Sequence, residues 1–560
     1  MKGQDRRHAR HEPAGPPQGR IPEGGARRIP DEPAGPPQGR KPACEARRYA
    51  DRYAVPVLIM MWLAATAWVR PLMLPDEGRY VGVAWEMLRA GDWLTPTLNG
   101  LPYFHKPPLF YWITAASLGM FGLNESAARL APLLGATAGA LALLAFTQRW
   151  VGRRVATVTL LVLLAQPLWI IGGQFANLDM LVAGCISATT LLLAHAALCF
   201  ERGLPYRRAL AGAYAAAALG VLAKGLIGAV LPALVLLAWL AMRRRWRTLF
   251  ALVWAPGMLL FLLIATPWFA AMQWRFSGFL DYFFVTQHFR RFTGSGFNNL
   301  QPFWFYPAVL SLFTLPWWPW VHRQWRRGAL SDPQHGPIRL LMWLWLLVVV
   351  VFFSLPRSKL LGYVLPALPP LAYLLADGFL SLTQPSARHR RLWWGSAALA
   401  ALLALGAVIT FAAHAPKSTR LLAAALSAQR ASHEPIFMLG QYFFDLPFYA
   451  RLRGPVAVVD DWASPRISQS DNWLKELADA GHFAKAEASR VLLTPEAFAS
   501  ALCVAPKAWV VAPASALGPY AFLLQARAVA NTPRATLWLI DPADPRTASA
   551  LGCAGTPNGD

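Results

Sequence analysis

Apolar stretches of about 20 residues that carry almost no charge recur along this chain of 560 residues. As an α-helix, a stretch of that length spans the roughly 30 Å hydrocarbon core of a bilayer. The windows with this character are 54–73, 129–147, 155–173, 180–199, 208–223, 226–242, 249–271, 303–321, 338–355, 361–380 and 393–413. The sequence therefore predicts an α-helical polytopic membrane protein with about 11–13 transmembrane helices.

The formal net charge of +24 would suggest a nucleic-acid partner if the basic residues formed one patch. With the N-terminus in the cytoplasm and alternating spans, the inside loops are 148–154, 200–207, 243–248, 322–337 and 381–392. These loops are rich in Arg and hold few acidic residues, namely Glu201 and Asp332. This distribution follows the positive-inside rule, so the charge indicates topology and no nucleic acid is expected.

The two ends of the chain differ from the membrane part, residues 53–414. Residues 1–52 contain "EPAGPPQGR" twice and little to bury, which predicts a disordered basic cytoplasmic tail without a signal peptide. Residues 415–560 contain the apolar runs "PIFMLG", "PVAVVD", "AWVVAP" and "TLWLID" between helical patterns, which predicts a small α/β domain on the outer side. Cys503 and Cys553 lie in that domain and would be able to pair in an oxidising compartment.

Polar residues of the membrane part gather on the predicted outer face, where ionisable groups usually mark a substrate site. The first outer loop, 74–128, carries "LPDEGRY" and "LPYFHKPP". Later outer turns carry "NLDM", "VLAKGLIG", "QHFRRFTG" and "RSKLLGY". The ionisable residues of these motifs include Asp76, Glu77, His105, Lys106, Asp179, Lys224, His288, Arg291, Arg357 and Lys359.

These residue types suit group transfer from a lipid phosphate. Cations without an acidic neighbour in sequence suit a phosphate, and they would stabilise it as it leaves. Asp76, with Glu77 beside it, is a candidate general base for an acceptor hydroxyl. Structural roles would also explain single residues, since acids favour helix N-termini and Lys106 could snorkel to the interface.

The run "LPDEGRYVGVAWEMLRAGDWLTPTLNGLPYFHKPPLFYWITAASLGMFGLNESAARLAPLLGA" (74–136) resembles the first-loop signature of the family 39 glycosyltransferases. That group includes bacterial aminoarabinose transferases that modify lipid A, and it is related to the protein O-mannosyltransferases. The resemblance implies a GT-C fold with an outward-facing cavity and a polyprenyl-phosphate sugar as donor.

The resemblance also implies roles for single residues. Asp76 resembles the essential acid of the first loop, and Asp179 the second acid of the cavity. Lys106, Arg291 and Tyr363 resemble the residues that grip the lipid phosphate. We add Glu77 to the catalytic candidates, Lys224 and Lys359 to the phosphate-binding set, and Arg79, Tyr80, Tyr103, His105 and His288 to the cavity.

The chain departs from the family at His105, where relatives usually have a Glu that in some of them belongs to a divalent-metal site. His binds zinc, and His288 is a potential companion, but a carboxylate is lost. The metal requirement therefore stays open, and no cofactor is assigned.

The predicted function is transfer of a sugar from undecaprenyl phosphate to lipid A or another envelope glycan, by a multi-pass protein of the bacterial inner membrane. The catalytic face and the C-terminal domain would be periplasmic. One alternative is transfer to Ser or Thr of a protein, as in the O-mannosyltransferases. Others are a lipid or solute transporter, for which one expects midplane charges and repeats, and an envelope protein that has lost activity.

Overall fold

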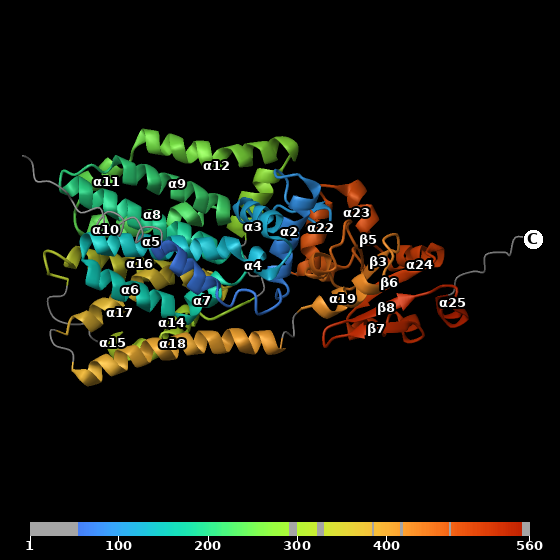
Figure 1. Cartoon of the computed structure of the whole chain (residues 1–560). Coiled ribbons are helices and arrows are strands. Elements are labelled where there is room, and N and C mark those ends of the chain that lie inside the picture. The colour runs from blue at the N-terminus through green and yellow to red at the C-terminus, as the bar shows by residue number, and fades with distance from the viewer. Residues whose placement is uncertain are drawn as a thin grey trace, which may run out of the picture. The chain divides into compact units, whose positions relative to one another are not determined.

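The computed structural model describes residues 54–290, 299–321, 330–382, 386–414, 418–469 and 472–551 (Figure 1). The predicted disordered tail, 1–52, lies outside the described residues. Of residues 287–290 the backbone alone is described.

Helices make up most of the described residues before 414. The first helix is Ala54–Ala64. The first outer loop then holds α2 (Asp76–Ala90), the hairpin β1 (Thr97–Leu98) and β2 (Leu101–Pro102), α3 (Leu109–Phe121) and α4 (Glu125–Ala128). The following helices are α5 (Leu130–Trp150), α6 (Arg153–Ala165), α7 (Pro167–Gly173), α8 (Leu178–Glu201), α9 (Arg207–Lys224), α10 (Ile227–Met242), α11 (Trp246–Leu252), α12 (Ala255–Arg275), η1 (Asp281–Arg290), α14 (Phe305–Phe313), η2 (Leu315–Trp317), α15 (Trp318–Val321), α16 (Gly336–Ser354), η4 (Leu361–Ala367), α17 (Leu368–Leu380) and α18 (Ala387–His414).

In the described part of the chain, 6 helices are long and apolar enough to cross a membrane, or 7 if the bent pair α6 and α7 forms one span. They are α5, α8, α12, α16, η4 with α17, and α18. The other predicted windows also hold helices, but these are shorter, more polar or broken. At Leu315–Trp317, for example, Pro316 removes a backbone donor and the helix tightens between α14 and α15. The chain is thus a multi-pass membrane protein, and its described residues hold fewer full-length spans than the predicted eleven to thirteen.

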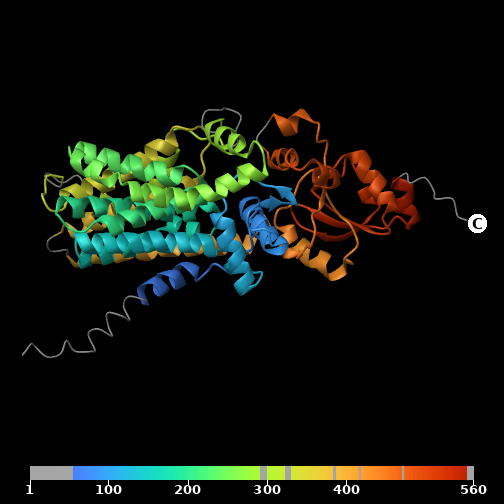
Figure 2. The same ribbon diagram turned by 90° about the horizontal axis from the view of Figure 1, so that it is seen from above.

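Glycines bring the central helices into close contact. A Cβ on Gly184 of α8 would lie 2.1 Å from the Gly135 carbonyl oxygen of α5, and one on Gly228 of α10 would lie 2.2 Å from the Gly220 carbonyl carbon of α9. Small residues allow such backbone approach between membrane helices. The packed helices, which run side by side in Figures 1 and 2, place the start of α8 beside the end of α9.

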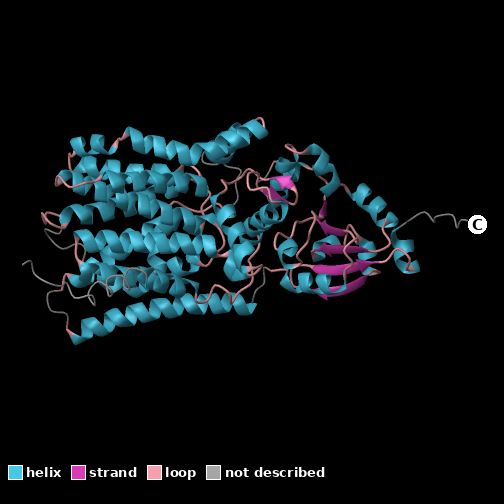
Figure 3. Ribbon diagram, turned by 45° about the horizontal axis from the view of Figure 1, so that its top comes forward, coloured by secondary structure: helices cyan, strands magenta, loops and turns pink. Residues whose placement is uncertain are grey.

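The C-terminal part folds around a six-stranded sheet in the order β5-β4-β3-β6-β8-β7 (Figure 3). The parallel strands are β3 (Ile436–Leu439), β4 (Ala457–Val459), β5 (Leu492–Leu493) and β6 (Ala508–Ala512), and the antiparallel edge is β8 (Thr536–Ile540) with β7 (Arg527–Asn531). The runs predicted as strands form β3, β4, β6 and β8. The helices are α19 (Arg420–Gln429), α20 (Leu446–Tyr449), α21 (Pro465–Ser468), α22 (Trp473–Gly481), α23 (Lys485–Val491), α24 (Pro495–Val504), η5 (Ala514–Ala516), η6 (Ala521–Leu524) and α25 (Pro545–Leu551).

The sheet domain packs directly on the first outer loop. The Asn99 amide exchanges two hydrogen bonds with the Val456 backbone, at 2.8 and 2.7 Å. Arg89 donates to the Leu452 carbonyl at 2.7 Å. Gly78 of α2 leaves room for the Asp445 backbone, since a Cβ there would lie 2.8 Å from its nitrogen. These contacts hold α22 close to the loop that carries the predicted site.

Candidate functional site

Helix α2 separates two neighbouring carboxylates. Asp76 and Glu77 open the helix, and because successive residues of an α-helix point about 100° apart, they face different surroundings. The Asp76 side chain is 29% exposed, whereas Glu77 is fully buried. The structure therefore gives these two acids different roles.

Asp76 faces a cavity of about 190 Å³. Most of the residues predicted for the site line it: Asp76, Arg79, Tyr80, Tyr103, His105, Lys106, Asp179, Lys224 and Tyr363. The remaining lining residues are Pro75, Asn177, Leu178, Asn299, Leu360, Asn472, Trp473 and Glu476. The first outer loop, four later segments of the membrane part and the C-terminal domain thus meet at one cavity.

Arg79 connects the loop to the C-terminal domain. Its guanidinium donates to Asp76 Oδ1 at 2.6 Å and to the Tyr80 hydroxyl at 3.1 Å, and it forms an ion pair with Glu476. It also lies 4.6 Å from the ring centroid of Trp473. Burial alone would lower the pKa of Arg79, but Glu476 raises it well above the ordinary value, so this cation stays charged and orients Asp76.

His105 lies among aromatic rings and acids. Its Nε2 and the Tyr282 hydroxyl form a hydrogen bond of 2.7 Å, and its ring stacks on Tyr103 with centroids 4.8 Å apart. His105 Nδ1 lies 3.8 Å from Glu476 Oε1, and the Tyr282 hydroxyl lies 3.4 Å from Asp479 Oδ2. Helix α22 therefore brings carboxylates beside the position where the family usually has a Glu.

The opposite wall pairs Asp179 with Lys224. Asn177 caps α8 and donates its amide to Asp179 Oδ2 at 3.1 Å. Lys224, at the end of α9, forms an ion pair with Asp179 and lies 4.3 Å from the ring centroid of Tyr363. Gly362 permits this packing, because a Cβ there would lie 2.0 Å from Asp179 Oδ2.

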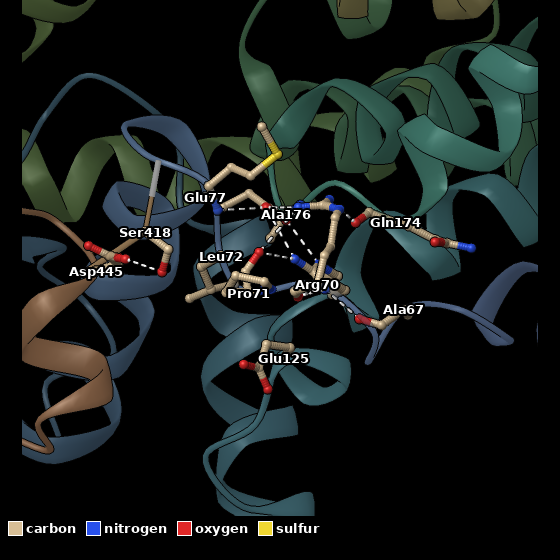
Figure 4. Close-up of polar contacts among 12 residues, drawn as sticks. Ala67, Arg70, Pro71, Leu72, Glu77, Glu125, Gln174, Ala176, Ser418 and Asp445 are labelled. Atoms are coloured by element: carbon tan, nitrogen blue, oxygen red, sulfur yellow. Dashed lines mark hydrogen bonds and ion pairs between the residues drawn. The ribbon is translucent and has the colours of Figure 1, made fainter. Parts of the chain in front are cut away.

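Glu77 lies outside the cavity lining and forms an ion pair with the buried Arg70 (Figure 4). Arg129 forms a second ion pair with Glu77 and completes a buried charge cluster. Glu77 accepts from Arg129 Nε at 2.9 Å and from the backbone nitrogens of Met73 and Ala176 at 2.9 and 2.8 Å. Burial alone would raise the pKa of Glu77, but the two arginines lower it to about 2. These contacts tie the turn before α2 to the turn before α8, which indicates a positioning role for Glu77. Its catalytic role stays a prediction.

Three residues predicted to bind phosphate or to line the cavity are not among the described lining residues. Lys359 lines a separate groove beside it. Arg291 and the side chain of His288 lie outside the described residues. Their predicted roles stay predictions.

The sequence analysis missed the contribution of α22. Asn472, Trp473 and Glu476 line the cavity from the C-terminal domain, almost 400 positions after Asp76. The pattern "NWLKELADAG" predicts an amphipathic helix with an Asn cap, as observed. It carries no signal for which surface that helix covers.

The potential metal ligands around His105 already have partners. Its Nε2 is engaged with Tyr282, and Glu476 is paired with Arg79. Among the residues that the structure describes, no group of three or more His, Cys, Asp or Glu is arranged to hold a metal ion. The metal requirement therefore stays open.

Comparison with known proteins agrees with this geometry. Residues 105–270 match the profile of the dolichyl-phosphate-mannose-protein mannosyltransferase family. The undecaprenyl phosphate-alpha-4-amino-4-deoxy-L-arabinose arabinosyl transferase of Pseudomonas aeruginosa is 35% identical over 308 residues, which are 54% of this chain and 55% of that relative. The enzyme of the same name from Aeromonas salmonicida is 32% identical over 336 residues, 59% of this chain and 60% of the relative. The matches thus span little more than half the length of these relatives.

The fold extends the similarity to nearly the whole chain. ArnT from Cupriavidus metallidurans bound to undecaprenyl phosphate superposes with a TM-score of 0.75 at 25% identity, covering 90% of this chain and 99% of that one. Its apo state gives 0.72 at 24% identity, covering 91% and 100%. The protein is therefore an integral membrane protein of the GT-C fold. The predicted resemblance to the family 39 glycosyltransferases, and within them to the aminoarabinose transferases, is confirmed.

Proposed function

We propose that the protein is a membrane glycosyltransferase that moves a sugar from a polyprenyl phosphate, such as undecaprenyl phosphate, to lipid A or another envelope glycan. One observation carries the proposal. The partly exposed Asp76 carboxylate shares a small cavity with the ammonium groups of Lys106 and Lys224, in a multi-pass membrane protein. An acid for the acceptor and cations for a phosphate are the two requirements of this transfer.

In the proposed reaction, the acceptor hydroxyl attacks the anomeric carbon of the sugar and gives its proton to Asp76. The bond between that carbon and the phosphate oxygen breaks, and the carrier leaves as a phosphate monoester. Lys106 and Lys224 stabilise the negative charge that develops on the leaving phosphate. Arg79 donates a hydrogen bond to Asp76 Oδ1 at 2.6 Å, which directs the carboxylate into the cavity.

We place the cavity and the C-terminal domain on the periplasmic side of the inner membrane. The Arg-rich loops, such as the one holding Arg243, support a cytoplasmic position for the opposite ends of the helices. Cys503 is disulfide-bonded, which suits the oxidising periplasm. Its predicted partner, Cys553, lies outside the described residues.

The test is mass spectrometry of lipid A and envelope glycans from cells that produce the wild type, no protein, or Asp76→Asn. The proposal expects one sugar-sized mass to be lost both in the deletion and in Asp76→Asn. The matched control is Asp281→Asn, an exposed acid outside the cavity lining, which should keep the modification.

A second acceptor class is favoured by the family profile over residues 105–270, which describes protein mannosyltransferases. If the lost mass is found on Ser or Thr of envelope proteins, the acceptor is protein. Unchanged lipids, glycans and proteins in the deletion strain would refute the transferase assignment.

A further inference from the structure

A groove of about 450 Å³ lies between the segment 300–303 and the end of α16. Its rim is apolar and exposed, since Leu300, Phe303 and Leu355 are 59%, 77% and 69% exposed. Its cations are Arg357, which is exposed, and Lys359, which is 3% exposed. The lining residues, all of them in the described part of the chain, include no Asp or Glu.

The groove and the cavity share a wall. Residues 299–301 and 357–359 pair as a short antiparallel bridge, with hydrogen bonds from the Lys359 nitrogen to the Asn299 oxygen at 3.1 Å and from the Gln301 nitrogen to the Arg357 oxygen at 3.0 Å. Neighbouring residues of an extended segment point to opposite faces. At this bridge Asn299 and Leu360 line the cavity, whereas Leu300, Gln301 and Lys359 line the groove.

Lys359 is a buried ammonium, and no ion pair joins it to a carboxylate of the described residues. Among the described residues its Nζ donates to the carbonyl oxygens of Gln301, at 3.0 Å, and of Pro356. Burial lowers the pKa of Lys359, because carbonyl dipoles replace hydration incompletely. An anion in the groove would favour the charged form of Lys359, and it would also meet the fork of donors on Arg357.

We propose that this groove binds the phosphorylated headgroup of a membrane lipid, and that it thereby holds the acceptor beside the cavity; only the second clause rests on the proposed function. The phosphate meets Arg357 and Lys359, and the acyl chains lie along Phe303 and Leu355 toward the bilayer. Exposed aromatic residues of this kind favour the headgroup level of a membrane. The bridge between residues 299–301 and 357–359 then separates the lipid phosphate from the site of transfer.

The test is a titration of the purified full-length protein in detergent with dihexanoyl phosphatidic acid, with bound lipid counted by native mass spectrometry. The wild type should bind this lipid more tightly than dihexanoyl phosphatidylcholine. Arg357→Gln should weaken binding roughly tenfold, the loss expected for one charge-assisted hydrogen bond. Lys359→Met should weaken the binding of phosphatidic acid at least as much. If Lys359→Met does not fold, the result for Arg357→Gln is sufficient to test the groove.

A control variant separates the groove from other cations. Arg275→Gln removes a half-exposed cation at the end of α12, outside the groove. The binding that Arg357→Gln loses should persist in Arg275→Gln. Equal affinity of the wild type and Arg357→Gln, or equal binding of the choline lipid, would overturn the proposal.

Two further outcomes show whether the ligand is a lipid or free phosphate, and whether this proposal and the proposed function fail separately. Inorganic phosphate that binds as tightly as phosphatidic acid would refute a lipid ligand. If cells show no sugar transfer while Arg357-dependent lipid binding persists, only the proposed function fails.

Discussion

The cluster around Glu77 predicts a large and specific loss of stability in Glu77→Gln. The carboxylate is fully buried, and its pKa falls from a usual value of 4.5 to about 2. At roughly 1.4 kcal/mol for each pKa unit, this difference corresponds to about 3 kcal/mol of stabilisation. The substitution also leaves Arg70 and Arg129 buried without their shared counter-charge, and breaking a buried pair in this way typically costs about 3–5 kcal/mol.

The assay is unfolding of the detergent-solubilised protein, followed by tryptophan fluorescence, at several pH values. Because the folded pKa is depressed, the stabilisation is fully present above pH 4.5 and is lost as the pH falls toward 2. The gap between wild type and Glu77→Gln should therefore be largest near neutral pH. The control is Glu125→Gln, whose partner Arg420 is 58% exposed, and which should cost no more than about 1 kcal/mol.

The result also decides between the two roles considered for Glu77. A variant with unchanged stability and lost transfer activity would restore the catalytic role predicted from the sequence. A variant as stable as Glu125→Gln would refute the claim that this cluster holds the turns before α2 and α8 together.

Three further perturbations follow from the described contacts. Glu476→Gln should lower kcat of the proposed transfer roughly tenfold or more, measured with the purified protein, because Arg79 loses the acid that fixes its position beside Asp76; unchanged kinetics would contradict this. Gly362→Ala should destabilise the protein or abolish activity, read by unfolding and transfer assays, since the added Cβ would lie 2.0 Å from the neighbouring carboxylate of α8. Burial raises the pKa of Asp445 to about 6 from a usual 3.8, so stability should fall as the pH rises from 3.8 to 6, and Asp445→Asn should remove that pH dependence of unfolding.

The sequence predicted those parts of the site that depend on local pattern. Apolar windows located the helices, and the motifs around Asp76, His105 and Asp179 identified residues that line one cavity. Hydropathy could not predict where helices stop, because Pro316 and the bend between α6 and α7 shorten helices without changing the mean hydropathy of the window.

The sequence could not separate Asp76 from Glu77. Both are acids at the start of α2, and their different surroundings depend on residues far along the chain. Arg129 lies 52 positions after Glu77, and Glu476 lies 397 positions after Arg79. Contacts between residues so far apart produce no periodic pattern in a single sequence. Only the fold therefore assigns one acid to the cavity and the other to the buried cluster.

The surroundings of His105 connect the replacement of the usual Glu at this position with the C-terminal domain. A carboxylate at position 105 would lie close to Glu476, and two acids at that distance would repel each other in a site that already contains Asp76. A histidine avoids this conflict, and it bonds to Tyr282 and stacks on Tyr103. The carboxylate that the loop lacks is thus supplied by α22, where it pairs with Arg79 and so acts on the orientation of Asp76. On this argument the C-terminal domain is part of the cavity itself, and removing it would leave Arg79 without the acid that sets its position.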